Sequence, residues 1–320
     1  MKTHIKTDIS YLKRFRLIIN ISFISILLLS LRTVPVTAQE PLKYRPYSSK
    51  EVKVLGVTTK VMAVGLNKRT QDEPVIILQS GALVPMEYWT PLISFISNLS
   101  PLIAYDRPGA GGSSFNGTEP TPEYIAGHLH ELLKAVKVPP PYILVGHSWG
   151  GPLILYYAGK YPEEVAGMVY VDPTDPGRTP ETFYMTSDRK KIAEMKAESD
   201  TLAKGLLNSN QGAGAEYRFI ESFFNMPVKA RRLPENPSVP TVFIIAGLYE
   251  NPGGLSFMDR AWHKKRLDLR IDRFRRVVHS LPQATLIIAS DTGHNIPMEA
   301  PDLIAGAIHR VKTQIQTGPP

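Results

Sequence analysis

The chain has 320 residues, with 37 Lys and Arg against 29 Asp and Glu, and it contains no cysteine. The absence of thiols excludes disulfide bonds, cysteine metal sites and a cysteine-linked lipid anchor, so stability must come from a packed apolar core. A chain of this length is sufficient to bury such a core.

Residues 1–38 have the pattern of a secretory signal peptide. Five basic residues in 1–16 precede an uncharged, mostly apolar stretch from Leu17 to Leu31, and Val36 and Ala38 stand where signal peptidase reads small residues. As a helix these fifteen residues would rise about 22 Å, less than the ~30 Å hydrocarbon core of a bilayer. We therefore predict a cleaved leader and a secreted or periplasmic protein without stable membrane insertion, rather than a retained anchor.

The remaining chain, 39–320, is predicted to be one domain, and beyond residue 50 short apolar runs alternate with amphipathic segments. This alternation is typical of an α/β protein with a mostly parallel sheet. Several runs are continuously apolar, as expected for strands buried on both faces. The strands are predicted at 59–65, 74–81, 102–109, 142–148, 167–173, 241–247 and 284–290, and the clearest helices at 121–136 and 301–315.

The stretch GHSWGG follows the apolar run YILV and precedes a helical pattern. Ser148 has Gly146 two residues before it and Gly150 two residues after it, which matches the Gly-x-Ser-x-Gly nucleophile elbow. In such a strand–turn–helix corner the flanking positions must lack side chains, and the serine hydroxyl stands clear of the backbone. We therefore predict that Ser148 is a nucleophile; the alternative is a glycine-rich packing turn.

The interval 173–240 shows no strand pattern, and its segments 187–207 and 215–226 have helical patterns. Its 68 residues exceed what a single crossover connection needs. We predict a helical cap inserted over one edge of the sheet, rather than an ordinary pair of crossover helices.

Positive charge is concentrated in the segment from His263 to Arg276. Two Asp and four apolar residues interrupt it, which favours a solvated helix face. Without residues 1–38 the chain keeps 31 basic and 28 acidic residues, a net charge of +3 instead of +8. We therefore expect no nucleic-acid partner.

A serine hydroxyl becomes a good nucleophile only when a base takes its proton. His294 lies in a short loop between the last predicted strand and the last helix, where a loop histidine can meet the serine at the same sheet edge. We predict His294 as this base. Among the other histidines, one lies in the leader (His4), three in helical patterns (His128, His130 and His309) and two in the charged helical region (His263 and His279). His147 adjoins the serine but is expected to point away from it.

Six short stretches stand in order between about residues 50 and 316: LQSGALVPMEYW, YDRPGAGGS, GHSWGG, YVDP, AGLYE and TGHNIPMEAP. In this order they resemble the α/β-hydrolase superfamily. The resemblance implies an eight-stranded, mostly parallel sheet flanked by helices, a helical cap, and a Ser–acid–His triad.

The resemblance leaves two places for the acid of the triad. Asp172 ends the stretch GMVYVDP, and Glu250 stands three residues after Gly247, where many relatives carry Asp. Either carboxylate would orient the imidazole of His294 and stabilise its charged form. Because Glu replaces the usual Asp at position 250, Asp172 is the preferred acid and Glu250 the alternative.

An oxyanion hole needs two backbone N–H groups aimed at the developing negative oxygen. Trp149, directly after the nucleophile, supplies one in this family, and Ala82, in the loop after Gln79-Ser80-Gly81, is the expected second. Asp106 and Arg107 are expected to brace this loop rather than to touch substrate. The sequence contains no metal cluster, phosphate-binding loop or cofactor motif, so no cofactor or metal is expected.

A serine nucleophile with a base and an oxyanion hole performs acyl transfer, usually to water. We predict a carboxylic-ester hydrolase acting on a small-molecule acyl substrate; a serine in the elbow argues against haloalkane dehalogenase and epoxide hydrolase chemistry, for which relatives carry Asp there. An amidase or aminopeptidase of the proline iminopeptidase type, an acyltransferase and a non-catalytic small-ligand binding protein remain as alternatives. The sequence leaves the oligomeric state open.

The cap residues bear on this choice. A peptidase would need acidic cap residues to hold a free amino terminus, but the candidates resemble solvated helix faces: Glu194, Glu198, Asp200, Glu216 and Glu221. An esterase would need an apolar pocket, for which the candidate lining residues are Met86, Trp149, Phe183, Tyr184, Phe219, Phe223, Phe224 and Met226.

Overall fold

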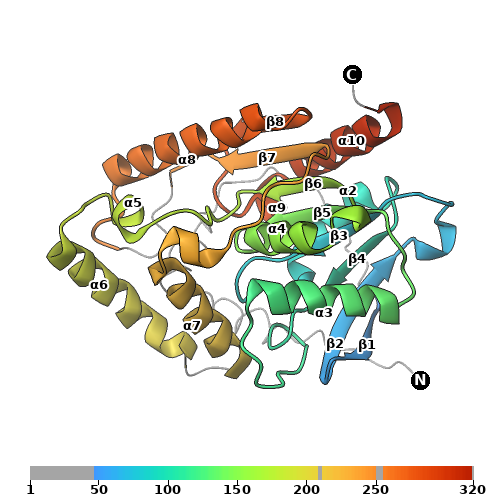
Figure 1. Ribbon diagram of the computed structural model, residues 1–320, viewed down its shortest axis with the longest axis horizontal. Coiled ribbons are helices and arrows are strands. Elements are labelled where there is room, and N and C mark those ends of the chain that lie inside the picture. Colours follow the sequence, from blue (N-terminus) through green and yellow to red (C-terminus); the bar gives the residue numbers. More distant parts are fainter. Residues whose placement is uncertain (1–46, 208–210, 250–254, 319–320) are drawn as a thin grey trace, which may run out of the picture.

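The computed structural model describes residues 47–207, 211–249 and 255–318, arranged as shown in Figure 1. The predicted signal peptide lies outside the described residues, and so does Glu250, the alternative acid. Within the described ranges no helix is long and apolar enough to cross a membrane.

One sheet of eight strands runs through the described part of the chain, in the order β1-β2-β4-β3-β5-β6-β7-β8. β2 is antiparallel to both of its neighbours, and all other neighbouring pairs are parallel. This confirms the predicted eight-stranded, mostly parallel sheet. The strands are β1 (Ser49–Val54), β2 (Val57–Val64), β3 (Val75–Gln79), β4 (Leu102–Tyr105), β5 (Tyr142–His147), β6 (Val165–Val171), β7 (Thr241–Ala246) and β8 (Ala284–Ala289).

β1 is the strand that the residue pattern does not reveal. Its sequence SKEVKV is largely exposed, because an edge strand has a neighbour on one side only. It therefore lacks the apolar run that marks β3 and β5, whose residues are all buried. Charged edge strands of this kind also resist pairing with other chains.

Helices cover both faces of the sheet and share an apolar core with it. α2 and α10 pack on one face, where Leu92 and Ile308 are fully buried, and α3, α4 and α8 pack on the other, where Leu132 and Phe274 are buried. The helices are α2 (Thr90–Ile96), α3 (Pro122–Ala135), α4 (Gly150–Lys160), α5 (Pro180–Tyr184), α6 (Arg189–Leu207), α7 (Gln211–Asn225), α8 (Arg260–Ser280), α9 (Ile296–Glu299) and α10 (Pro301–Thr317), with 3-10 turns η2 (Leu66–Lys68), η3 (Met86–Trp89), η4 (Pro162–Glu164) and η5 (Val228–Arg231).

The segment between β6 and β7, residues 172–240, contains α5, α6 and α7, and its described residues form no strand. We call this segment the insertion. Figure 1 places its three helices together at one end of the molecule. The rings of Phe223 and Phe224 in α7 pack 5.3 and 5.9 Å from the ring of Trp149, so α7 lies over the loop after β5.

The parallel strands end at a common edge of the sheet, and their following loops meet there. The loops after β3, β5, β6 and β8 carry, in that order, the predicted site residues Ala82, Ser148, Asp172 and His294. The insertion covers the same edge. The fold therefore brings together residues that are far apart in the sequence.

Candidate active site

Ser148 occupies a strained turn between β5 and α4. Its φ angle is 53°, in the left-handed region that is costly for a residue with a side chain. A Cβ on Gly146 would lie 2.5 Å from the carbonyl oxygen of Gly150, and a Cβ on Gly150 would lie 2.2 Å from that of Gln79. Only glycine fits at both positions, which is the physical reason for the spacing seen in the sequence.

Two backbone N–H groups flank this turn without an internal acceptor. Within the described ranges neither Ala82 nor Trp149 donates its N–H to another group. The loop that carries Ala82 approaches the serine closely, because a Cβ on Gly81 would lie 3.1 Å from the Cβ of Ser148. Such a pair of donors can stabilise a negative oxygen that forms beside Ser148.

Arg107 braces the loop after β3, as predicted. Its guanidinium donates to the carbonyl oxygens of Ser80 and Gly81, each at 2.7 Å, and pairs with Glu216 in α7 at 2.8 Å. Glu216 also accepts the N–H of Leu83 at 2.7 Å. Burial would lower the pKa of Arg107, but the Glu216 carboxylate raises it, so the guanidinium stays charged.

Asp106 holds the same region from the other side by accepting the N–H groups of Met86 and Gly112, each at 2.7 Å. The interpretation of Glu216 as part of a solvated helix face is wrong: its side chain is 6% exposed in this ion pair. Glu216 therefore joins the insertion to the loop of Ala82.

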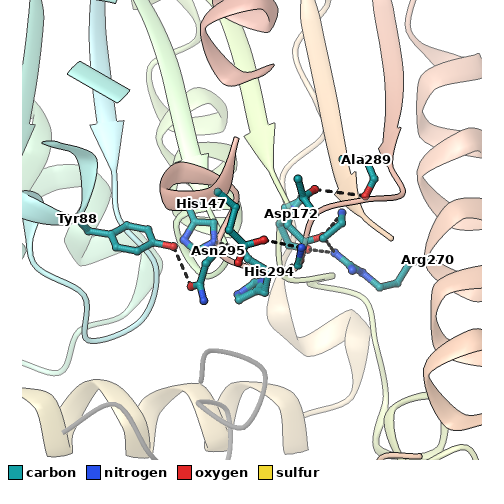
Figure 2. A network of polar contacts seen from close by, with 12 residues as sticks. Tyr88, His147, Asp172, Arg270, Ala289, His294 and Asn295 are labelled. Carbon is teal, nitrogen blue, oxygen red and sulfur yellow. Dashed lines mark hydrogen bonds and ion pairs between the residues drawn. The ribbon is translucent and has the colours of Figure 1, made fainter. Parts of the chain in front are cut away.

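Asp172 and His294 form the central contact of the site (Figure 2). The Nδ1 atom of His294 lies 2.5 Å from Oδ2 of Asp172, while Oδ1 accepts from Arg270 at 2.8 Å and from the backbone N–H of Ala246 at 2.9 Å. Burial raises the pKa of Asp172, but the charge of Arg270 and the hydrogen bond from His294 outweigh it and hold this pKa well below its usual range. An ionised carboxylate only accepts, so Nδ1 carries the proton and Nε2 of His294 is left as a base.

His147 fixes the position of the His294 loop. Its Nε2 donates to the backbone carbonyl of His294 at 2.9 Å, and the two rings lie 4.8 Å apart. Burial, together with the neighbouring His294, lowers the pKa of His147 to about 3, so the ring is neutral. Tyr88 adds a second contact to this loop by donating to the side-chain oxygen of Asn295 at 3.1 Å (Figure 2).

A single cavity brings together the predicted nucleophile, base and preferred acid. Ser148, Asp172 and His294 all line it, and with its open mouth it encloses about 590 Å³. The other lining residues are Pro173, Thr174, Asp175, Arg178, Thr182, Phe183, Met185, Arg266, Leu269 and Arg270.

Most of the candidate aromatic lining residues serve packing in the insertion, the other role that their helical spacing allows. Of the candidates, only Phe183 lines this cavity, whereas Phe219, Phe223 and Phe224 pack around Trp149 in a buried cluster. Met86 is likewise buried, in the core beside α2. These rings hold the insertion on the elbow and do not form a wall beside the nucleophile.

The charged segment in α8 is not only a solvated face. Arg270 is 7% exposed and bound to Asp172, and Arg266 lines the cavity. A signal for both was present in the sequence, because Trp262, Arg266, Arg270 and Phe274 follow one another at intervals of four and so share one helix face. Two of these residues are large and apolar, which marks this face as the one turned inward.

Comparison with known proteins gives the class of the protein. Residues 74–308, more than half of the chain, match the family model of the alpha/beta hydrolase fold, and the chain belongs to this family. It is 26% identical to a (Lyso)-N-acylphosphatidylethanolamine lipase of Mus musculus over 286 residues, 79% of this chain and 78% of that protein. A 35% identity to the uncharacterized protein YqjL of Bacillus subtilis (strain 168) spans 98 residues, 31% of this chain and 39% of that protein.

Solved structures agree on the fold. A putative lipase from Acinetobacter baumannii AYE superposes with a TM-score of 0.58 at 16% identity, over 85% of this chain and 92% of that one. A haloalkane dehalogenase and an epoxide hydrolase also match, so the fold alone does not determine the reaction. The protein is an α/β hydrolase with lipases among its relatives, and the choice of chemistry depends on its site.

Proposed function

We propose that the protein is a serine esterase that hydrolyses carboxylic esters of small molecules through an acyl-enzyme, in a secreted or periplasmic form that has lost residues 1–38. The observation that carries this proposal is the buried hydrogen bond from His294 to Asp172 at the wall of a cavity that Ser148 also lines. A base oriented by a carboxylate beside a serine in a strained elbow is the arrangement that nucleophilic catalysis requires. The lipase relatives support the same class of reaction.

In the proposed mechanism, Nε2 of His294 takes the hydroxyl proton of Ser148 as its oxygen attacks the ester carbonyl. The N–H groups of Ala82 and Trp149 stabilise the tetrahedral oxyanion. The C–O bond then breaks, and His294 gives its proton to the leaving alcohol. Water repeats the sequence on the acyl-enzyme, releasing the carboxylic acid and restoring Ser148. Throughout, Asp172 stabilises the imidazolium without taking its proton.

The insertion acts as a cap in this proposal. α7 packs its aromatic side chains on Trp149 and binds Arg107 through Glu216, which supports a water-excluding cover over the cavity. Exclusion of water from the site strengthens the interactions of the oxyanion hole.

The aminopeptidase alternative has less support. Glu216 is committed to Arg107, Glu221 and Asp200 bind Lys196, and Glu198 accepts from Ser256. The cavity wall instead contains arginines, which repel a protonated amino terminus. Four of the five candidate acids are therefore already occupied, and the fifth, Glu194, is 64% exposed on α6.

A fluorophosphonate label tests the proposal. The full-length protein should be labelled at Ser148 and the Ser148→Ala variant should not, while Ser94→Ala, a serine in α2, should be labelled as the wild type is. A panel of p-nitrophenyl esters, lactones, amides and aminoacyl arylamides then ranks the substrate classes, and added alcohol or thiol acceptors test for acyl transfer. Absence of labelling in the wild type would contradict the esterase and favour a binding protein.

A further inference from the structure

An arginine from α8 binds the acid of the proposed triad (Figure 2). Nη2 of Arg270 donates to Oδ1 of Asp172 at 2.8 Å and to the backbone carbonyl of Pro173 at 3.1 Å. Both side chains of this ion pair are buried, so solvent screens it only weakly. Among the described residues, Arg270 is the one Lys or Arg within ion-pair distance of Asp172. A triad needs only a serine, an imidazole and a carboxylate, so the proposed mechanism leaves this arginine without a role.

The contacts of Asp172 divide between its two carboxylate oxygens. Oδ1 accepts from Arg270 and, at 2.9 Å, from the backbone N–H of Ala246 at the end of β7. Oδ2 lies 2.5 Å from Nδ1 of His294. Because hydrogen-bond donors prefer to lie near the plane of a carboxylate, the two donors on Oδ1 fix that plane and aim Oδ2 at the imidazole. Arg270 thus helps to position the acid, and through the acid it positions the base.

Arg270 also changes the charge that His294 faces. A lone buried carboxylate attracts a proton to the neighbouring imidazole, because it stabilises the charged form of the ring. The guanidinium and the carboxylate together carry no net charge, and burial strengthens both Coulomb interactions. Burial raises the pKa of Asp172, and the charge of Arg270 is the largest of the causes that lower it again. The acid is therefore ionised, and His294 faces an ion pair in place of a lone anion.

Other titratable groups also surround His294. His147 in β5 is neutral, because burial and the nearby His294 lower its pKa to about 3. Glu299 in α9 accepts a backbone N–H of the His294 loop at 2.7 Å, and Asp175 in the loop after β6 binds Arg273 of α8 at 2.9 Å. The further groups are Tyr88 in η3, Arg178 before α5, and His263 and Arg266 in α8. All of these stay in place when Arg270 is replaced, so a comparison of variants isolates its charge.

We propose that Arg270 is a positioning residue that keeps the enzyme active in mildly acidic solution. It aims the carboxylate of Asp172 at His294 and offsets the charge of that carboxylate, so the imidazole remains available as the base at a lower pH. Since the imidazole and the carboxylate interact strongly, a proton that enters belongs to the pair, and the pH profile of the reaction reports the pair as a unit. Loss of the guanidinium leaves this pair more negative, so it takes up the proton at a higher pH. The inference rests on the proposed esterase function and adds its pH range.

The test is the pH dependence of kcat/KM for a short p-nitrophenyl ester, read at the isosbestic wavelength of p-nitrophenol. Arg270→Gln keeps a hydrogen-bond donor but loses the charge, and the acid limb of its profile should move about one unit to higher pH. Arg270→Lys keeps the charge, and its acid limb should lie within about 0.3 units of that of the wild type. A merely structural role would lower kcat in both variants and leave both limbs in place. The position of a limb does not depend on how much of the protein is correctly folded.

Arg273→Gln is the matched control. Arg273 lies three positions further along α8 and binds Asp175, not the acid of the triad. Its replacement removes the same unit of charge, and the acid limb should lie within about 0.3 units of that of the wild type. Circular dichroism at each pH confines the comparison to the range in which every variant is folded. An unshifted limb in Arg270→Gln, a shift in Arg270→Lys as large as in Arg270→Gln, or an equal shift in Arg273→Gln overturns the inference.

Proton uptake by His294 is also measured without turnover, by heteronuclear NMR of the imidazole groups in the Ser148→Ala background. The signal of His294 is the one that disappears when this residue is replaced by glutamine. Adding Arg270→Gln should move its titration about one unit to higher pH, and an unchanged titration overturns the inference. If the fluorophosphonate does not label the wild type but this titration moves, the esterase is refuted and the role of Arg270 stands. Labelling at Ser148 without any shift refutes the role of Arg270 and leaves the esterase standing.

Discussion

The buried ion pair between Arg107 and Glu216 leads to a quantitative prediction. The two side chains are 1% and 6% exposed, and Glu216 accepts three hydrogen bonds: from Nε of Arg107 at 2.8 Å, from its Nη2 at 3.1 Å and from the N–H of Leu83 at 2.7 Å. Glu216→Ala leaves a buried guanidinium without its counter-charge, a change that costs about 3–5 kcal/mol. We expect a decrease of this size in the free energy of unfolding.

The same substitution should lower activity. Leu83 follows Ala82, whose N–H is the proposed oxyanion donor, and removal of one such donor costs on the order of 10²–10³ in kcat. Because Arg107 still holds the carbonyls of Ser80 and Gly81, we expect a smaller decrease in kcat, about ten- to a hundredfold. Glu216→Gln keeps an acceptor for Leu83 and should show an intermediate loss of both quantities.

Urea unfolding followed by circular dichroism measures the first effect, and hydrolysis of a short p-nitrophenyl ester measures the second. Glu194→Ala is the control, because this side chain is 64% exposed on α6, and its effect should stay within about 0.5 kcal/mol. If Glu216→Ala unfolds at the wild-type urea concentration and keeps the wild-type kcat, the ion pair does not hold the oxyanion loop and the reasoning is wrong.

Three further predictions concern other parts of the molecule. Asp172→Asn should lower kcat on a p-nitrophenyl ester about 10⁴-fold, whereas Glu250→Gln should stay near the wild type; the reverse result would make Glu250 the acid. Burial lowers the pKa of His128 from 6.5 to about 4, so the unfolded chain binds the extra proton between these values and stability falls as the pH falls through them. Between pH 7 and pH 5, the free energy of unfolding measured with urea should therefore decrease by about 2 kcal/mol less in His128→Gln than in the wild type. Equal decreases in the two proteins would refute this. A Cβ on Gly212 would lie 2.3 Å from the Cα of Gly109, so Gly212→Ala should lower the free energy of unfolding by about 1–3 kcal/mol. A Cβ on Gly306 meets open space, so Gly306→Ala should raise it by about 0.5–1 kcal/mol. Thermal unfolding measures both changes.

The parts of the site that the sequence predicted are those with a local signature. The turn at Ser148 needs glycine at 146 and 150, because the backbone approaches itself too closely there for a side chain. This requirement is visible in the five consecutive residues 146–150, so the sequence alone predicts it. The strands beside it are recognisable as buried apolar runs. Asp172 follows the buried strand β6, and His294 follows β8, an apolar but partly exposed edge strand, so their place at the sheet edge followed from the order of the elements.

The parts that the sequence did not predict depend on contacts between distant segments. Arg270 binds a carboxylate 98 positions earlier, and Arg107 binds one 109 positions later, so neither pairing leaves a local pattern. The charged pattern of α8 favoured a solvent-exposed helix, because arginines that face inward cannot be told from exposed ones by charge alone. The sequence left open whether the aromatic residues of the insertion serve packing or line a pocket, because both roles give the same helical spacing, and most of them pack around Trp149.

The packing around Trp149 gives the protein an intrinsic optical reporter. Its indole ring sits among the rings of Phe219, Phe223 and Phe224, while its backbone stands beside the nucleophile. Movement of α7 away from the elbow would expose this indole to water and shift its emission to longer wavelength. A chain in which Trp89 and Trp262 are replaced by phenylalanine would thus report, by fluorescence alone, whether the insertion lifts when a ligand enters.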